Sequence, residues 1–233
     1  MTSMKNLKSI YFILIFSLFM AGKTQAQDWA NLKKYQNENA ALPTAKPKQK
    51  RAVFMGDSIT EFWSVTSSDF FADKPYINRG ISGQTTPQML LRFRQDVIAL
   101  KPAVVVILAG INDIAGNTGP STLEMTTNNI ISMAELAKAN HIKVILCSVL
   151  PAFDFPWRKG LEPAEKVVKL NLMIKEYADA NGILYLDYYS AMADEQKGMK
   201  VEYANDGVHP NKTGYKVMEP LVEKAISEVL SKK

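Results

Sequence analysis

Three polar residues from two distant segments have the types and the spacing of a hydrolytic triad. His209 follows Asp206 by three residues near the C-terminus, so one turn can place the carboxylate beside one ring nitrogen of the imidazole. The other ring nitrogen would then be free to act as a general base. Ser58 supplies a candidate nucleophile, because it follows the apolar run from Ala52 to Met55 and a glycine that permits a sharp turn. These residues form a candidate catalytic triad.

Each of these segments also has an interpretation that involves no catalysis. Asp57 or Ser58, placed after a strand, is a good helix N-cap. Asp206 and His209 could instead close a turn through a side-chain hydrogen bond. Neither segment by itself decides between the two interpretations.

A third segment favours catalysis. The continuous apolar run from Val104 to Leu108 is typical of a strand buried on both faces, and Asn112 follows it. In open parallel sheets the carboxyl ends of the strands line the ligand crevice, so the amide of Asn112 can face a substrate oxyanion. Ester cleavage passes through such an oxyanion, and removing one preorganised donor to it typically costs roughly 100- to 1000-fold in turnover. The three segments therefore converge on one edge of the predicted sheet.

Four sequence blocks, in this order along the chain, resemble those of a known enzyme family. The blocks are Gly56-Asp57-Ser58, Asn78-Arg79-Gly80-Ile81-Ser82-Gly83, Gly110-Ile111-Asn112-Asp113 and Asp206-Gly207-Val208-His209-Pro210. They are similar to the blocks of the SGNH hydrolases, also called GDSL esterases and lipases. The first block continues into Trp63, as in the small acylhydrolases of that family.

The resemblance implies a role for each matched residue. It implies that Ser58 is the nucleophile, that His209 is the base and that Asp206 orients His209. It also implies an oxyanion hole made by the backbone amides of Ser58 and Gly83 and the side chain of Asn112. The implied enzyme is a carboxylic ester hydrolase with a flavodoxin-like strand order.

Other catalytic motifs match poorly. The nucleophile elbow of α/β-hydrolases needs glycine at position 60, where this chain has Thr60. Neither a dinucleotide-binding glycine fingerprint nor a phosphate-binding loop is present. The two histidines, His141 and His209, are far apart and there is one cysteine, so a zinc site would depend largely on carboxylates. We therefore expect no metal and no organic cofactor, and we expect His141 to be an exposed loop residue.

Residues 1–26 have the features of a signal peptide. Lys5 and Lys8 precede an apolar stretch from Ile10 to Met20, and Thr24-Gln25-Ala26 offers small residues at the outer positions of a cleavage site. The stretch is too short to span a bilayer comfortably, although an uncleaved anchor is an alternative. We expect export to a bacterial periplasm or the cell exterior, with no membrane span after cleavage.

Composition excludes other classes of protein. The formal net charge of +5 includes the lysines of the predicted signal peptide, so the remainder is nearly neutral and no nucleic-acid partner is expected. The single Cys147 cannot form an internal disulfide, and it ends an apolar run typical of a buried strand.

Apolar runs alternate with helical patterns through residues 52–233, which are long enough for one domain with a full core. Strands are expected at Ala52 to Met55, Tyr76 to Asn78, Val104 to Leu108, Val144 to Ser148 and Ile183 to Asp187, and helices near Pro87 to Ala99, Ser121 to Asn140, Pro163 to Asn181 and Lys212 to Leu230. This alternation predicts an α/β fold with a five-stranded parallel sheet and helices on both faces. The family resemblance adds the flavodoxin-like order of a three-layer α/β/α sandwich.

Residues 27–51 should hold a linker and a short helix that docks through Trp29, Leu32 and Tyr35.

The segment from Leu150 to Gly160 follows the fourth predicted strand and should lie at the same edge as the triad. Trp63 and Trp157 could stack on a sugar and Arg158 could bind a polar substituent, although both tryptophans could merely pack the rim.

We expect an exported serine esterase that removes short acyl groups, acetyl foremost, from a small-molecule or glycan ester. The alternatives are a lipase, lysophospholipase or thioesterase acting on longer acyl chains and, from a different class, a non-catalytic glycan-binding module.

Overall fold

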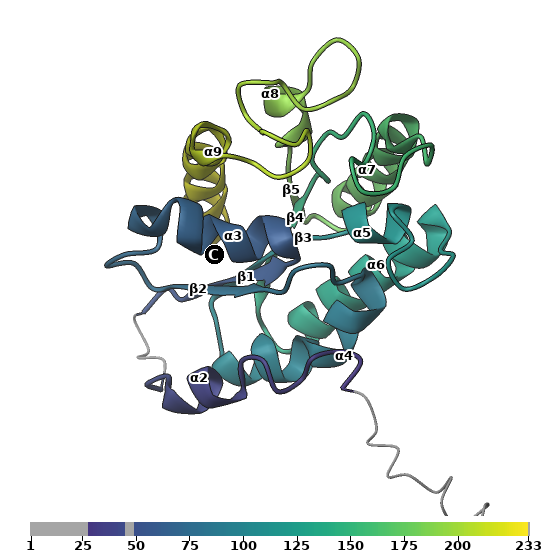
Figure 1. The fold of residues 1–233 in the computed structure, drawn as a ribbon. Coiled ribbons are helices and arrows are strands. Elements are labelled where there is room, and N and C mark those ends of the chain that lie inside the picture. The colour runs from purple at the N-terminus through teal and green to yellow at the C-terminus, as the bar shows by residue number, and fades with distance from the viewer. Residues whose placement is uncertain (1–27, 45–48, 233) are drawn as a thin grey trace, which may run out of the picture.

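Five short parallel strands form a sheet in the order β2-β1-β3-β4-β5 (Figure 1). The strands are β1 (Ala52–Gly56), β2 (Tyr76–Gly80), β3 (Val104–Leu108), β4 (Lys143–Cys147) and β5 (Leu184–Leu186). They are seen in a computed structural model that describes residues 28–44 and 49–232. The predicted α/β fold, the parallel sheet and the flavodoxin-like strand order are confirmed.

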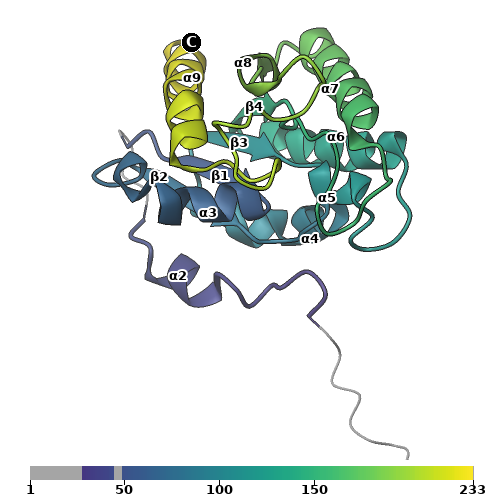
Figure 2. The same cartoon turned by 45° about the horizontal axis from the view of Figure 1, so that its top comes forward.

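Helices cover both faces of this sheet. They are α2 (Gln36–Ala41), α3 (Ser58–Thr66), α4 (Thr86–Asp96), α5 (Ile111–Ile114), α6 (Leu123–Ala139), α7 (Pro163–Ala180), α8 (Tyr189–Met192) and α9 (Lys212–Ser231). Helices α4, α6 and α7 lie side by side on one face, and α3 and α9 cover the other (Figures 1 and 2). The four predicted helices correspond to α4, α6, α7 and α9. Helix α3 was not predicted, and helices α5 and α8 are missing from the prediction because four residues are too few to show a helical period.

The helix predicted near the N-terminus begins later than expected. Asp28 accepts hydrogen bonds from the backbone amides of Leu32 at 2.8 Å and Lys33 at 3.0 Å, and this local bonding competes with a helix. Asn31 has a φ of +55°, which also interrupts a helix. The chain therefore turns through these residues, and α2 starts only at Gln36.

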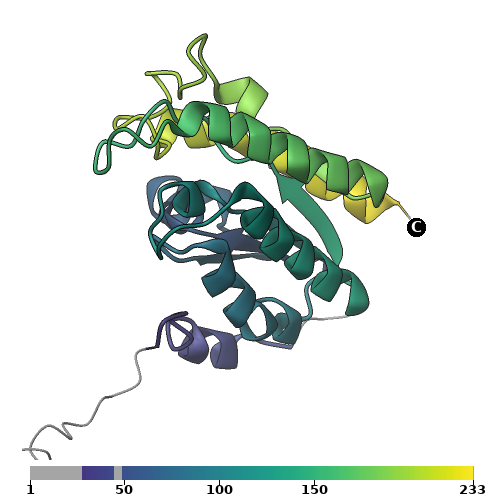
Figure 3. The same ribbon diagram turned by 90° about the vertical axis from the view of Figure 1, so that its right-hand side faces the viewer.

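This N-terminal segment, residues 28–42, packs on α4 and lies across the molecule from α7 and α9 (Figure 3). The predicted docking is correct for Tyr35, which is buried and whose hydroxyl donates to the carbonyl oxygen of Gly80. It is wrong for Trp29 and Leu32, which remain 45 % and 40 % exposed because the turns direct them outward.

Two single-residue predictions are confirmed, and one segment cannot be compared. Cys147 is buried in β4, and His141 is exposed in the loop before β4. The predicted signal peptide lies outside the described residues. Among the helices that are described, none is long and apolar enough to cross a membrane.

Trp63 belongs to the aromatic core between the sheet, α3 and α9. Its ring stacks on Phe70 and Tyr215 with centroid distances of 5.0 Å and 5.3 Å, and it meets the edge of Phe54 at 5.8 Å. Only 1 % of its surface is exposed, so the prediction that Trp63 stacks on a sugar is wrong. The reason is helical geometry, since residues five apart, such as Ser58 and Trp63, lie on different faces of α3.

A close contact presses the first turns of α3 onto the end of β2. A Cβ atom at Gly80 would come within 2.1 Å of the backbone nitrogen of Glu61 and 2.7 Å of the carbonyl oxygen of Asp57. Only glycine permits this approach. The contact fixes the helix that begins with Ser58 relative to the loop that follows β2.

Candidate active site

Ser58 is the first residue of α3 and is separated from β1 only by Asp57, so its side chain lies at the carboxyl end of the sheet. Asp57 caps this helix by accepting a hydrogen bond from the amide of Ile59 at 2.9 Å. The two interpretations of this segment are therefore compatible, because Asp57 caps the helix and Ser58 remains available as a nucleophile. The hydroxyl oxygen of Ser58 lies 2.9 Å from Nε2 of His209.

The loop before α9 holds Asp206 and His209 as a hydrogen-bonded pair. Nδ1 of His209 lies 2.7 Å from Oδ2 of Asp206, while Oδ1 accepts from the backbone amides of Val208 at 2.9 Å and His209 at 2.8 Å. Partial burial acts to raise the pKa of Asp206, but the hydrogen bonds from the His209 ring and the two amides outweigh it and hold the pKa below its ordinary value. An ionised Asp206 can thus orient the imidazole and stabilise its protonated form.

Groups suited to an oxyanion lie in the loop after β2 and in α5, the short helix that follows β3. Nδ2 of Asn112 donates to the carbonyl oxygen of Gln84 at 3.1 Å, and its Oδ1 accepts from Nδ2 of Asn117 at 2.9 Å. These bonds set the orientation of the amide and leave its second N–H for a ligand. Gly83 has a φ of +75°, which glycine adopts readily. No acceptor among the described residues takes the backbone amide of Gly83 or Ser58.

Two exposed aromatic rings flank His209. The ring centroids of Phe62 and Trp157 lie 5.6 Å and 5.7 Å from that of the imidazole. The sequence placed Trp157 at this edge but gave no sign of Phe62, because its pattern did not predict α3. On that helix Ser58 and Phe62 are four residues apart and share a face.

Arg158 links two loops at the edge of the site. Its Nη1 donates to the carbonyl oxygens of Ala115 at 2.7 Å and Gly116 at 3.0 Å. The loop after β4 is thereby tied to the loop after β3. A contact between Arg158 and substrate stays a prediction.

Two buried carboxyl groups belong to the same edge of the sheet. Burial raises the pKa of Asp57 to about 7 and also raises the pKa of Asp113. Asp113 accepts hydrogen bonds from the backbone amide and hydroxyl of Thr86 at 2.9 Å and 2.6 Å, which connects α5 to the start of α4. Within residues 28–44 and 49–232, no group of three His, Cys, Asp or Glu side chains has the arrangement of a metal site.

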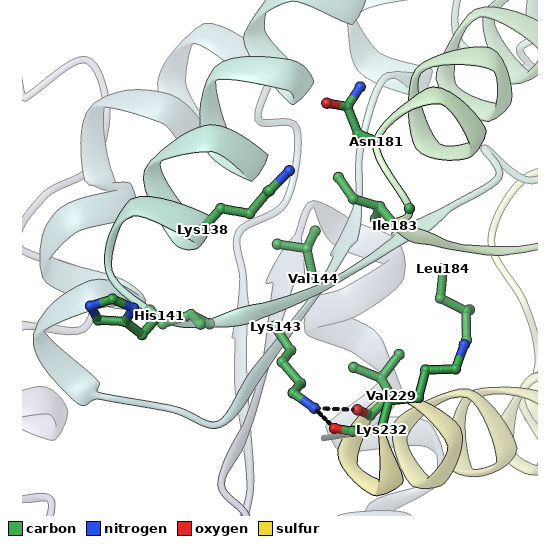
Figure 4. Close-up of a pocket in the computed structure, with 11 residues that line it drawn as sticks. Lys138, His141, Lys143, Val144, Asn181, Ile183, Leu184, Val229 and Lys232 are labelled. Carbon is green, nitrogen blue, oxygen red and sulfur yellow. Dashed lines mark hydrogen bonds between the residues drawn. The ribbon is translucent and has the colours of Figure 1, made fainter.

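A separate pocket lies at the amino ends of β4 and β5, at the opposite edge of the sheet from Ser58 (Figure 4). Its volume is about 490 Å³, and its lining includes Lys138, Lys143 and Lys232. Nζ of Lys143 donates to the carbonyl oxygen of Val229 at 2.8 Å, near the C-terminal end of α9. This lysine therefore has a structural role as a helix cap.

Several known proteins similar to this chain are described as esterases or lipases. The sequence model of the GDSL-like Lipase/Acylhydrolase family matches residues 54–217. A GDSL-like lipase from Bacteroides thetaiotaomicron is 55% identical, with a TM-score of 0.84 and coverage of 85% of this chain and 98% of that chain. A Bacteroides fragilis protein is 52% identical, with a TM-score of 0.86 and coverage of 88% and 99%. An acetylxylan esterase of Xylanibacter ruminicola is 26% identical over 223 residues, which cover 80% of this chain and 45% of that protein, so the chain spans about half the length of this curated relative.

Proposed function

We propose that this chain, which belongs to the GDSL-like Lipase/Acylhydrolase family of carboxylic ester hydrolases, removes acetyl or other short acyl groups from a carbohydrate. The observation that carries the proposed mechanism is the hydrogen-bonded chain from Asp206 through His209 to Ser58, with contacts of 2.7 Å and 2.9 Å. The similarity to an acetylxylan esterase and the predicted export of the chain support the choice of substrate.

The proposed reaction has two halves. Ser58 Oγ attacks the ester carbonyl carbon while Nε2 of His209 takes its proton, and the resulting oxyanion is bound by the amides of Ser58 and Gly83 and the side chain of Asn112. When the tetrahedral intermediate collapses, His209 returns the proton to the departing alcohol and an acyl-serine remains. In the second half, His209 deprotonates water, which attacks the acyl-serine. When this intermediate collapses, His209 returns the proton to Ser58 Oγ and the free acid is released.

The position of the two aromatic rings favours a cyclic alcohol. Because His209 protonates the leaving oxygen, the alcohol part of the ester must lie next to the imidazole when the bond breaks. Phe62 and Trp157 flank that ring and are 41 % and 49 % exposed, so the alcohol would pass between or along them. Apolar faces of a sugar ring suit such a contact. The aromatic rings would then select the alcohol and not the acyl group.

The preferred acyl chain can be measured with p-nitrophenyl esters from acetyl to palmitoyl, alongside acetate release from acetylated glycans. We expect kcat/KM to peak at acetyl or propionyl. A long acyl chain would gain about 0.8 kcal/mol per buried methylene and would need a sizeable apolar groove. A peak at octanoyl or longer would replace this proposal with the lipase, lysophospholipase or thioesterase alternative.

The role of the aromatic pair can be separated from the chemistry. We expect Trp157→Ala to lower kcat/KM on an acetylated glycan by roughly 3- to 10-fold, the scale of an aromatic contact, with little change on ethyl acetate, whose alcohol has no ring. Trp29→Ala is a matched control, because Trp29 is similarly exposed but lies on the N-terminal segment. Equal losses on both substrates would mean that Trp157 only maintains the rim of the site.

A further inference from the structure

Arg92 on α4 is a fully buried cation that the proposed reaction does not use. Its side chain is 0 % exposed, and among the described residues its one acidic partner is Asp96, with Nη1 and Oδ2 3.1 Å apart. A buried ion pair contributes little net stability, because desolvation of two charges offsets their attraction. The other hydrogen bonds of the guanidinium indicate a role for Arg92 beyond stability.

Those other bonds reach the end of β1 and the loop after β2, which lead to two of the proposed oxyanion donors. Nη2 donates to the carbonyl oxygen of Gly56 at 3.0 Å, two residues before Ser58. Nε donates to Oε1 of Gln84 at 2.6 Å, and Gln84 directly follows Gly83. The planar guanidinium holds its donors in a rigid fork, so it fixes the distance between these two acceptors.

Gln84 extends the connection to α5, which carries Asn112. Its carbonyl oxygen accepts from Nδ2 of Asn112 at 3.1 Å, while its side-chain amide donates to the carbonyl oxygen of Ala30 at 2.8 Å. Gln84 is itself only 3 % exposed. The segments that carry Ser58, Gly83 and Asn112 thus all meet on Arg92 or on its direct partner.

We propose that Arg92 and Gln84 are positioning residues that hold the three oxyanion donors in one geometry. This inference rests on the proposed function, because it concerns the oxyanion hole assigned there. It goes further in assigning a role to two buried side chains that touch no substrate. Their effect should appear in the chemical step and act through the donors, above all through Asn112, which bonds to Gln84 directly.

Two substitutions break the connection from opposite ends. Arg92→Lys keeps the charge beside Asp96 but loses the fork, and Gln84→Met keeps the side-chain volume but loses the acceptor for Nε. We expect each to lower kcat on p-nitrophenyl acetate by about 10-fold or more with little change in KM, a smaller loss than the roughly 100- to 1000-fold expected for a missing donor. Arg94→Lys on the exposed side of α4 is the matched control and should leave kcat unchanged.

A double-mutant cycle with Asn112→Ala separates positioning from general stability. If Arg92 acts through the oxyanion donors, Asn112→Ala should cost clearly less in the Arg92→Lys or Gln84→Met background than in the wild type. Normal kcat in the folded variants, or a full Asn112→Ala loss in both backgrounds, would overturn the inference. If Arg92→Lys does not fold, the Gln84→Met cycle alone decides. If the wild-type protein hydrolyses no ester, the proposed function is refuted. That result can be distinguished from the two that would overturn the role of Arg92 and Gln84.

Discussion

At the scale of single residues, the site is set by bonds that leave one group free for chemistry. Both oxygens of Asp206 are occupied by the loop that carries His209, so the carboxylate cannot turn away from the imidazole. The amide of Asn112 is likewise held at both ends, by Gln84 and Asn117, with one N–H remaining. Such preorganised donors cost no rearrangement when charge develops on the substrate.

This arrangement makes a prediction for Asn112. Asn112→Ala removes a donor that is needed most in the transition state, so kcat should fall roughly 100- to 1000-fold with a modest change in KM. Asn128→Ala, at an exposed position on α6, should leave both constants unchanged. Steady-state kinetics on p-nitrophenyl acetate measure both. If KM rises while kcat stays normal, Asn112 binds the ground state and the oxyanion assignment is wrong.

At the scale of elements, the geometry of α3 explains why Phe62 was missed and why Trp63 was wrongly assigned to the substrate. The helix presents Ser58 and Phe62 to the site and buries Trp63 in the core, because its faces repeat every 3.6 residues. Read as a linear motif, these residues indicated Ser58 as the candidate nucleophile, which lies beside His209 in the structure, but they could not distinguish exposed from buried aromatic residues. The prediction of Trp63 as a substrate contact failed for that reason.

Asp57, the N-cap of α3, makes the stability of the folded protein depend on pH. Burial raises the pKa of Asp57 from 3.8 to about 7, so the unfolded chain releases this proton at lower pH than the folded protein does. Proton release therefore favours unfolding, and stability should fall as pH rises from about 4 to about 7. Asp57→Asn keeps an oxygen for the Ile59 amide and removes the titration.

We expect Asp57→Asn to be more stable relative to wild type at pH 8 than at pH 5, by on the order of a few kcal/mol. Urea unfolding at the two pH values measures this difference. Asp73→Asn is a suitable control, because Asp73 is exposed and asparagine tolerates its positive φ. An advantage of Asp57→Asn that is the same at both pH values would show that Asp57 is not protonated in the folded state.

At the scale of the whole molecule, the sequence predicted the layers of the fold but not the order of the strands. Alternation of apolar runs with helical patterns is enough to indicate a parallel sheet covered on both faces. It carries no information on which strands are neighbours, and the strand order came from the family resemblance. The same resemblance brought together residues that are more than 140 positions apart, since Ser58 and His209 contact each other across the sheet edge.

Two other features could not be predicted from the sequence. The position of α2 depends on the local bonds of Asp28, which compete with the helical spacing of the apolar residues around it. The buried Arg92 is an unremarkable polar residue in a helical pattern until its partners Gly56 and Gln84 are seen. Composition and periodicity encode neither the local hydrogen bonds of Asp28 nor the packing around Arg92.

The most direct test of the proposed mechanism is the turnover of purified, folded Ser58→Ala on p-nitrophenyl acetate. Because the triad acts as a unit, we expect kcat to fall by several orders of magnitude, and the Ser58→Ala/His209→Ala double variant to be little slower than either single variant. Thermal unfolding should confirm that the variants are folded. Near-normal hydrolysis by folded Ser58→Ala would contradict the assignment of Ser58 as the nucleophile.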